Sequence, residues 1–272
     1  MVLVFLLRAT AKMFDLNAYF LALAMVMSVA VLAWGISLLL RDVSIVDSLW
    51  SLMIAITSIA YLFLTSEIGL RGYVILCLVW VWAIRLSVYI TWRNWGTDED
   101  YRYREIRKNN EPNFEVKSLY IIFGLQAFAA SIVSLSLLAG IVGQSEIGWL
   151  DFFGLLVWII GFLFESISDY QLAHFRSQPI NKNQVFDSGL WRYTRHPNYF
   201  GDFCVWWGFY LFALSSGGWW AIISPLLMSF LLLKFSGVSV LEKTIKIRRP
   251  AYAEYLESTN KFFPGPRKKS RV

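Results

Sequence analysis

The sequence predicts an all-α integral membrane protein in which seven transmembrane helices form a single domain. Of the 272 residues, 57% are hydrophobic and only 16% are charged, and the mean hydropathy is +0.52. Seven apolar stretches also approach the roughly 20 residues that a transmembrane helix needs. Because soluble domains carry about 25% charged residues, this composition argues against one.

The expected spans are separated by loops that carry most of the charge. They cover residues 16–40, 44–65, 72–92, 119–142, 150–168, 201–214 and 219–241. The sixth is the shortest, and Pro225 should bend the seventh near its start because proline removes a helical hydrogen bond. Within one domain of residues 1–272, we therefore expect an N-terminal tail (1–15), a seven-helix bundle (16–241) and a cytoplasmic C-terminal segment (242–272).

The distribution of positive charge predicts the orientation. With seven spans, 20 of the 25 Lys and Arg residues fall in loops 1, 3 and 5 and in the C-terminal segment. Since cytoplasmic loops are enriched in Lys and Arg, the N-terminus is expected outside and the C-terminus in the cytoplasm. The net charge of +6 therefore reflects membrane topology and does not indicate nucleic-acid binding.

Neither a metal site nor a disulfide framework is expected. Cys77 and Cys204 lie in apolar stretches, and His174 and His196 are the only histidines. Without a CxxC motif or a His/Cys cluster, these residues lack the spacing of metal ligands. GxGxxG and Walker motifs are also absent from the sequence, so any nucleotide would be held without a Rossmann unit.

The densest group of polar residues lies in residues 189–202. Its charged and amide side chains are Arg192, Arg195, His196, Asn198 and Asp202. Pro197 suits the first position of a helix, on which Asn198, Asp202 and Trp206 would share one face. The basic residues would then precede a helix N-terminus, which favours anions. This predicts a seat for a charged cofactor; anchoring at the water–membrane boundary is the alternative.

Several polar residues lie within the second and third spans. Asp47 is one turn into the second span, where it either contacts substrate or reaches back to the interface, since an unpaired carboxylate in a membrane is costly. Arg85 and Tyr89 are four positions apart on the third span, and Arg93 continues that face. Arg85 is too deep to reach water, so its expected partner is Asp47, Glu165 or a cofactor phosphate.

The cytoplasmic end of the fifth span and the loop after the third span carry further polar residues. Glu165 and Asp169 are four positions apart, and Arg176 follows. Carboxylates for ribose hydroxyls and an Arg for phosphate are parts of a dinucleotide site, although a solvated loop with weak ion pairs is the alternative. Residues 93–105 mix charge with aromatic side chains, as in a lid or an amphipathic surface helix.

These motifs together resemble the steroid 5-alpha-reductase family, and most closely its bacterial membrane branch. The resemblance is carried by Gly189-Leu-Trp-Arg-Tyr-Thr-Arg-His-Pro-Asn-Tyr-Phe-Gly-Asp202, Asp169-Tyr-Gln171, Leu241-Glu-Lys243, Arg249-Pro-Ala-Tyr252, Val43-Ser-Ile-Val-Asp-Ser-Leu-Trp50 and Asp98-Glu-Asp-Tyr-Arg-Tyr103. It implies a seven-helix reductase in the inner membrane of a bacterium. The expected reaction uses NADPH to reduce the enone double bond of a lipid from the bilayer, typically a 3-oxo-4-ene steroid. Hydride goes to the β carbon while a protein acid holds the carbonyl oxygen.

The resemblance also assigns roles by position. Together with the motifs themselves, it predicts cofactor contacts for Arg85, Arg93, Asp169, Arg176, Arg195, His196, Asn198, Asp202, Glu242, Arg249 and Tyr255. Asp47 lies where the family places a Glu that binds the ketone, so we expect it to be catalytic and to contact substrate together with Trp50 and Trp206. The family's Tyr on the third helix corresponds to Trp82 here, which leaves Tyr89 or a water as the proton donor.

Two other classes of function are open. The short motif Arg195-His-Pro-x-Tyr199 also occurs in membrane methyltransferases, such as isoprenylcysteine carboxyl methyltransferases, so an S-adenosylmethionine-dependent isoprenoid or lipid methyltransferase is the alternative. Asn198, Asp202 and Asp169 favour the reductase. A transporter would place polar groups near mid-membrane with paired halves, and no internal repeat is visible. The sequence does not predict an oligomeric state.

Overall fold

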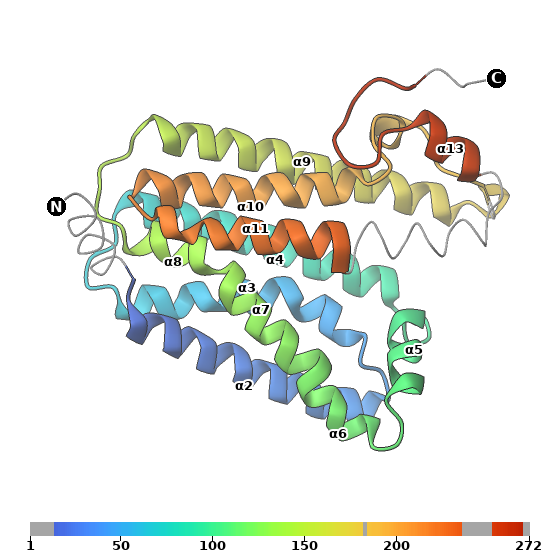
Figure 1. The fold of residues 1–272 in the computed structure, drawn as a ribbon, viewed down its shortest axis with the longest axis horizontal. Helices are drawn as coiled ribbons and strands as arrows, with labels where there is room; N and C mark the ends of the chain where they lie inside the picture. Colours follow the sequence, from blue (N-terminus) through green and yellow to red (C-terminus); the bar gives the residue numbers. More distant parts are fainter. Residues whose placement is uncertain (1–13, 182–183, 236–251, 269–272) are drawn as a thin grey trace. The chain divides into compact units, whose positions relative to one another are not determined.

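The computed structural model describes residues 14–181, 184–235 and 252–268, and every regular element within them is helical (Figure 1). The chain that the sequence treats as one domain packs as two compact units. Unit 1 comprises Met1–Asp151 and Phe212–Ser224, and unit 2 comprises Phe152–Leu211 and Pro225–Val272.

Most helices belong wholly to one unit. Unit 1 contains α2 (Leu16–Leu40), α3 (Ile45–Leu64), α4 (Leu70–Asn94), α5 (Tyr101–Asn109), α6 (Phe114–Ser118), η1 (Leu119–Gly124), α7 (Leu125–Val133), α8 (Leu135–Val142) and η4 (Trp219–Ile222). Unit 2 contains η2 (Pro179–Asn181), η3 (Gly189–Arg192), α13 (Tyr252–Ser258), η5 (Leu231–Phe235) and most of α9 (Trp149–Ser177), α10 (Pro197–Ser215) and α11 (Ile223–Phe230).

Five helical stretches of the described chain are long and apolar enough to cross a membrane. They are α2, α3, α4, the continuous run Phe114–Val142, and α9. The segment Trp219–Lys234 is apolar but shorter, and α10 is not among the five. These helices identify the chain as a membrane protein. The expected total of seven spans and their orientation remain predictions.

Helix α2 shows how unit 1 packs. Its buried residues are almost all small and recur every three or four positions: Ala18, Ala22, Val26, Ala30, Ala33 and Ser37. Small side chains let helices approach closely where no hydrophobic force drives them together in lipid. Exposed Leu32 and Leu39 lie on the other side of the helix and suit contact with acyl chains.

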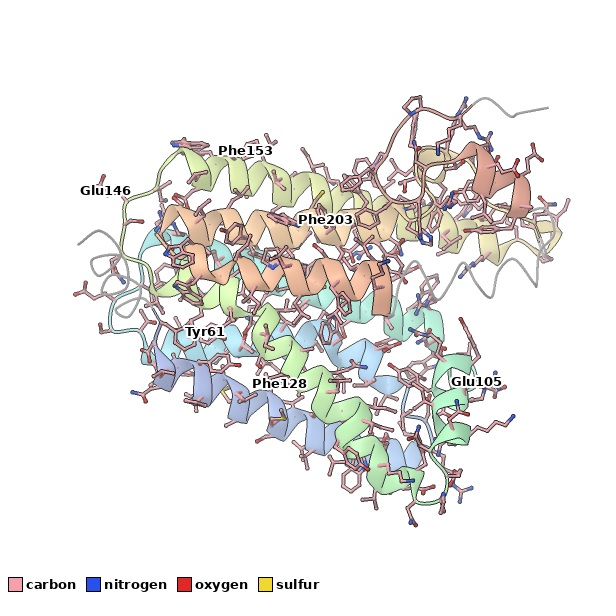
Figure 2. The ribbon with its side chains drawn as sticks, viewed as in Figure 1. Tyr61, Glu105, Phe128, Glu146, Phe153 and Phe203 are labelled. Atoms are coloured by element: carbon pink, nitrogen blue, oxygen red, sulfur yellow. The ribbon has the colours of Figure 1, made fainter. Side chains whose placement is uncertain are left out.

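Buried hydroxyls within unit 1 find partners across helices. The hydroxyls of Tyr61 on α3 and Ser134 between α7 and α8 are 2.6 Å apart and hydrogen-bonded. Ser224 donates to the carbonyl of Val133. Figure 2 marks Tyr61 among the side chains of unit 1. Because an unpaired hydroxyl is costly in hydrocarbon, these bonds stabilise the register of the helices.

A buried ion pair joins the first turn of α4 to the first turn of α9. Arg71, in the first turn of α4, contacts Asp151 through Nε–Oδ1 (2.6 Å) and Nη2–Oδ2 (3.0 Å). It also donates to the carbonyls of Ser145 (2.9 Å) and Glu146 (2.7 Å) in the loop before α9 (Glu146 is labelled in Figure 2). Ser215 donates to Asp151 at 2.5 Å. The expected spans place Arg71 in a loop, so the sequence did not predict its pair with Asp151.

Glycines bring α9 and α10 into close contact within unit 2 (Figure 1). A Cβ on Gly201 would lie 2.4 Å from the backbone nitrogen of Glu165 and 2.5 Å from the carbonyl of Gly161. A Cβ on Gly208 would meet the carbonyl of Gly154 at 2.9 Å. This packing places the polar residues of α9 directly beside those of α10.

Candidate functional site

Helix α9 continues nine residues beyond the expected end of its span. The sequence places that end at residue 168, whereas the helix runs to Ser177. Hydropathy marks where apolar residues stop, but a helix can continue into water if its residues are good helix formers. His174 and Arg176 lie in its last turn, where positive charge suits the helix dipole. Glu165, Asp169 and Arg176 therefore lie on one continuous helix.

Helix α10 begins at Pro197, as the sequence predicts. The side-chain amide of Asn198 donates to Oδ1 of Asp169 on α9 at 3.3 Å. Glu165 and Asp169 are each 3% exposed, and Asp202 is 7% exposed. The structure thus brings together the two predicted polar faces and buries their carboxylates between apolar helices.

The stretch before α10 is also a docking platform for the C-terminal segment. The Arg195 guanidinium donates from Nη1 to the carbonyls of Leu256 (2.7 Å) and Thr259 (2.8 Å). Thr194 donates to the carbonyl of Phe262 at 2.7 Å, and the Tyr255 hydroxyl to that of Trp191 at 2.5 Å. These bonds join α13 and residues 259–262 to residues 191–195 within unit 2 (Figure 1).

Two predicted cofactor residues therefore have structural roles in this structure. Arg195 and Tyr255 both bond to backbone carbonyls of unit 2, and burial raises the pKa of the Tyr255 hydroxyl. His196 is buried and stacks on Tyr199, with ring centroids 5.7 Å apart. Arg176 is exposed near the end of α9. Their contact with a cofactor stays a prediction, and Glu242 and Arg249 lie outside the described residues.

A hollow of about 290 Å³ lies at the C-terminal end of α9 in unit 2. Its walls come from the last turns of α9 and from residues 186–189, and include Tyr170, His174, Phe175 and Phe186. Phe175 and Phe186 stack at 4.7 Å, and Tyr170 and His174 at 6.0 Å. Aromatic walls with nearby amides suit a flat ring, and the volume is close to the lower end for small-ligand sites.

A second polar cluster surrounds Asp47 in unit 1. Arg102 on α5 donates to Oδ2 of Asp47 at 2.7 Å, and the Tyr103 hydroxyl donates to Oδ1 at 2.5 Å. Gln126 on α7 donates to the Tyr103 oxygen at 3.1 Å. Arg102 also pairs with Asp100, the N-cap of α5, at 3.0 Å. The cluster joins the start of α3 to α5. Since α5 begins at Tyr101, part of the stretch 93–105 is helical.

The charges of this cluster support one another. Burial alone would raise the pKa of Asp100, but hydrogen bonds from the side chain and backbone of Arg102 overcome that effect and lower it. Burial would likewise lower the pKa of Arg102, but its bond to Asp100 and the charge of Asp47 raise it. Burial, followed by the negative charge of Asp47, raises the pKa of Tyr103 well above 10. Tyr103 therefore keeps its proton at neutral pH.

The remaining predicted site residues are a group on α4 and two tryptophans, one in each unit. The Arg85 and Arg93 guanidiniums lie 5.6 and 5.8 Å from the centre of the Tyr89 ring, so these three form a group on α4. Trp50 is half-buried in unit 1, whereas Trp206 is fully buried in unit 2 against Phe209, with ring centroids 5.3 Å apart. Over the described ranges, no group of three His, Cys, Asp or Glu side chains could hold a metal.

Tyr103, Arg102 and Gln126 were missed as site residues. The stretch 98–103 drew attention for its mixed charge, but nothing local in the sequence indicates that it folds back to Asp47. The available signals were the intramembrane carboxylate itself and the mixture of arginine and tyrosine in residues 98–103, which do not indicate that the two are partners. Only the packing of α5 against the start of α3 identifies the partners.

The comparisons with known proteins match most of the chain and name no reaction. The family described as "Protein of unknown function (DUF1295)" matches residues 33–259. An uncharacterized protein of Schizosaccharomyces pombe is 25% identical over 288 aligned positions, which cover 92% of this chain and 81% of the relative. No solved structure matches the chain.

Proposed function

The chain belongs to the DUF1295 family, and we propose that it is a membrane reductase that uses NADPH to reduce the enone double bond of a bilayer lipid. A 3-oxo-4-ene steroid is the proposed type of substrate, and the cytoplasmic membrane of a bacterium the proposed location. The proposal depends on one observation above all. Three carboxylates are buried on the apolar helices α9 and α10, and the half-buried amide of Asn198 donates to one of them, in surroundings where polar groups are costly and mark functional sites.

The donors and acceptors in unit 2 fit a dinucleotide. Asp169 and Asp202 are acceptors of the kind that bind ribose hydroxyls, and the Asn198 amide can both donate and accept, as a carboxamide partner must. Arg176 supplies an exposed guanidinium of the kind that binds phosphate. The aromatic hollow beside Tyr170 and Phe186 suits the flat ring of an adenine.

The reaction needs an electrophilic partner for the substrate carbonyl. When bound, NADPH supplies the hydride for the β carbon of the enone. The role of the chain is to orient the enone, exclude water and hold the carbonyl oxygen as negative charge develops on it. We assign the carbonyl-binding role to the Asp47 cluster, where a guanidinium and a phenol both donate hydrogen bonds to one carboxylate.

Cofactor binding tests the proposal directly. Purified protein in detergent should melt several degrees higher with saturating NADPH, since a ligand at 100 times its Kd adds about 2.7 kcal/mol of stability. Asn198→Ala should abolish this shift, whereas Asn109→Ala, at the exposed end of α5, should retain it. Stabilisation by S-adenosylmethionine instead of NADPH would favour the methyltransferase that shares the 195–199 motif. No shift with either compound would contradict both functions.

A further inference from the structure

Residues 259–268, named here the C-terminal loop, are fixed along unit 2 by hydrogen bonds between backbone groups. The amide of Gly265 donates to the carbonyl of Tyr193 at 3.1 Å. The amide of Arg195 donates to the carbonyl of Asn260 at 2.9 Å. Both partners lie just before α10, so the loop follows one path beside the start of that helix.

The C-terminal loop places an aromatic ring near the level where the apolar part of α9 ends. Phe263 packs edge-on against Phe200 and Phe203 of α10, with ring centroids 6.1 and 5.9 Å apart. Phe200 in turn packs against Phe164 of α9 at 5.3 Å. Exposed apolar side chains continue along α9 as far as Ile167, about one turn beyond Phe164. Phe263 therefore lies near the last apolar turn of a helix that is long enough to cross a membrane.

Phe263 is exposed, whereas the residue before it is buried. The Phe262 side chain is 6% exposed, and that of Phe263 is 63% exposed. A phenyl ring left in water loses the free energy that burial would provide, and the boundary between lipid headgroups and acyl chains can bury it. The position and exposure of Phe263 thus suit insertion into this boundary.

Basic residues predominate in the C-terminal loop and in the stretch on which it lies. Residues 187–195 and 259–268 together hold five basic residues and one carboxylate, that of Asp187. The exposed basic residues are Arg192, Lys261, Arg267 and Lys268. Asp187 forms an ion pair with one of them, Arg267. The exposed Glu254 and Glu257 lie on α13, outside the two stretches. The surface around Phe263 therefore carries an excess of positive charge.

We propose that the C-terminal loop binds an anionic phospholipid of the bilayer. The exposed basic side chains hold the phosphate of the headgroup, and Phe263 lies among the first carbons of the acyl chains. Positive charge beside an aromatic ring at the end of a membrane-spanning helix is the pattern that attracts anionic lipids. The site belongs to unit 2 alone and requires neither NADPH nor reductase activity.

Lipid binding to the full-length protein in detergent tests the proposal. Native mass spectrometry without NADPH would give the Kd of phosphatidylglycerol and of phosphatidylcholine with the same acyl chains. The wild type should bind phosphatidylglycerol about tenfold more tightly, because basic side chains near an anionic lipid favour its binding. Lys261→Gln/Lys268→Gln should lose most of this preference. Arg104→Gln/Lys108→Gln, which removes two exposed charges from α5, is the matched control and should retain it.

Two further measurements separate the apolar contact from the charge. Phe263→Ala should weaken the binding of both lipids by about tenfold and keep the preference between them, because burial of the ring does not depend on the headgroup. Inorganic phosphate at the concentration of the lipid should not displace phosphatidylglycerol, since it has no acyl chain to contact Phe263.

Four outcomes would overturn the proposal: a wild type that binds both lipids alike, a Lys261/Lys268 variant that keeps the preference, an equal loss in the α5 control, and displacement by inorganic phosphate. The last would indicate a site for a free anion. Melting temperatures in detergent report whether each variant is folded. If the Lys261/Lys268 variant is unfolded, Lys268→Gln alone gives the same comparison, with a loss of about threefold expected. An unchanged preference in that variant would contradict the proposal.

Discussion

Unit 1 contains two arginine–carboxylate networks at opposite ends of α3 and α4, and they differ in how fully the protein closes them. In the Arg71–Asp151 pair the side chains are only 2% and 5% exposed, and further bonds go to Ser145, Glu146 and Ser215. In the Arg102–Asp47 pair the side chains are 26% and 20% exposed. A phenol shares the second network, whereas backbone carbonyls and serine hydroxyls complete the first.

This difference separates a structural network from a site. Every guanidinium nitrogen of Arg71 bonds to a fixed group of the chain, so no position is left for a ligand. At Asp47, one partner is a hydroxyl that can turn to another acceptor. The same residue types therefore stabilise the fold at one end of unit 1 and are available for chemistry at the other.

Breaking the closed network should have the largest effect on stability. Arg71→Met leaves Asp151 buried without its charge partner, which costs about 3–5 kcal/mol. The melting temperature in detergent should fall by roughly 10 °C. Arg104→Met, which removes an exposed arginine of α5, serves as the control and should change little. Equal melting temperatures for the two variants would show that burial of the Arg71 pair does not matter.

Breaking the open network should cost less stability but more activity. Asp47→Asn keeps the shape of the side chain and removes its charge, while Arg102 keeps Asp100 as a partner. We expect a loss of about 1–2 kcal/mol, because the pair is partly exposed. Enone reduction should fall at least tenfold, whereas Asp98→Asn at an exposed position should leave both properties unchanged. A destabilisation as large as that of Arg71→Met would place Asp47 among structural residues.

The smallest expected effect is the response of the open network to acid. Because the pKa of Asp100 is lowered in the folded protein from its ordinary value of 3.8, its stabilisation is present above that value. It is lost as the pH falls through the lowered pKa. Melting temperatures measured from about pH 4.5 down to about pH 2 should therefore decline less steeply for Asp100→Asn than for the wild type. Glu105→Gln, which changes an exposed acid on the same helix, is the control, and parallel curves for Asp100→Asn and wild type would contradict the role of Asp100.

Helix boundaries were predictable where a local signal marks them. Helix α2 covers residues 16–40 as expected, and α10 begins at Pro197, where a missing N–H has no cost. The end of α9 was misplaced because hydropathy reports the membrane boundary and not the helix boundary. The sequence predicts a polar face on each of α9 and α10, and the Asp169–Asn198 bond shows that the structure brings the two faces together.

The sequence by itself determined that this is a helical membrane protein with a polar, family-specific stretch before α10. Apolar segments must satisfy their backbone hydrogen bonds internally, and only helices do this within one segment, so composition is sufficient for that conclusion. Only the tertiary structure decided which charges pair. Asp47 pairs with Arg102, 55 positions away, and Arg71 with Asp151, 80 positions away. Such pairs depend on how each helix is rotated about its axis and where it contacts its neighbours, which small residues such as Ala22 and Gly201 set through packing that spacing along the chain does not reveal.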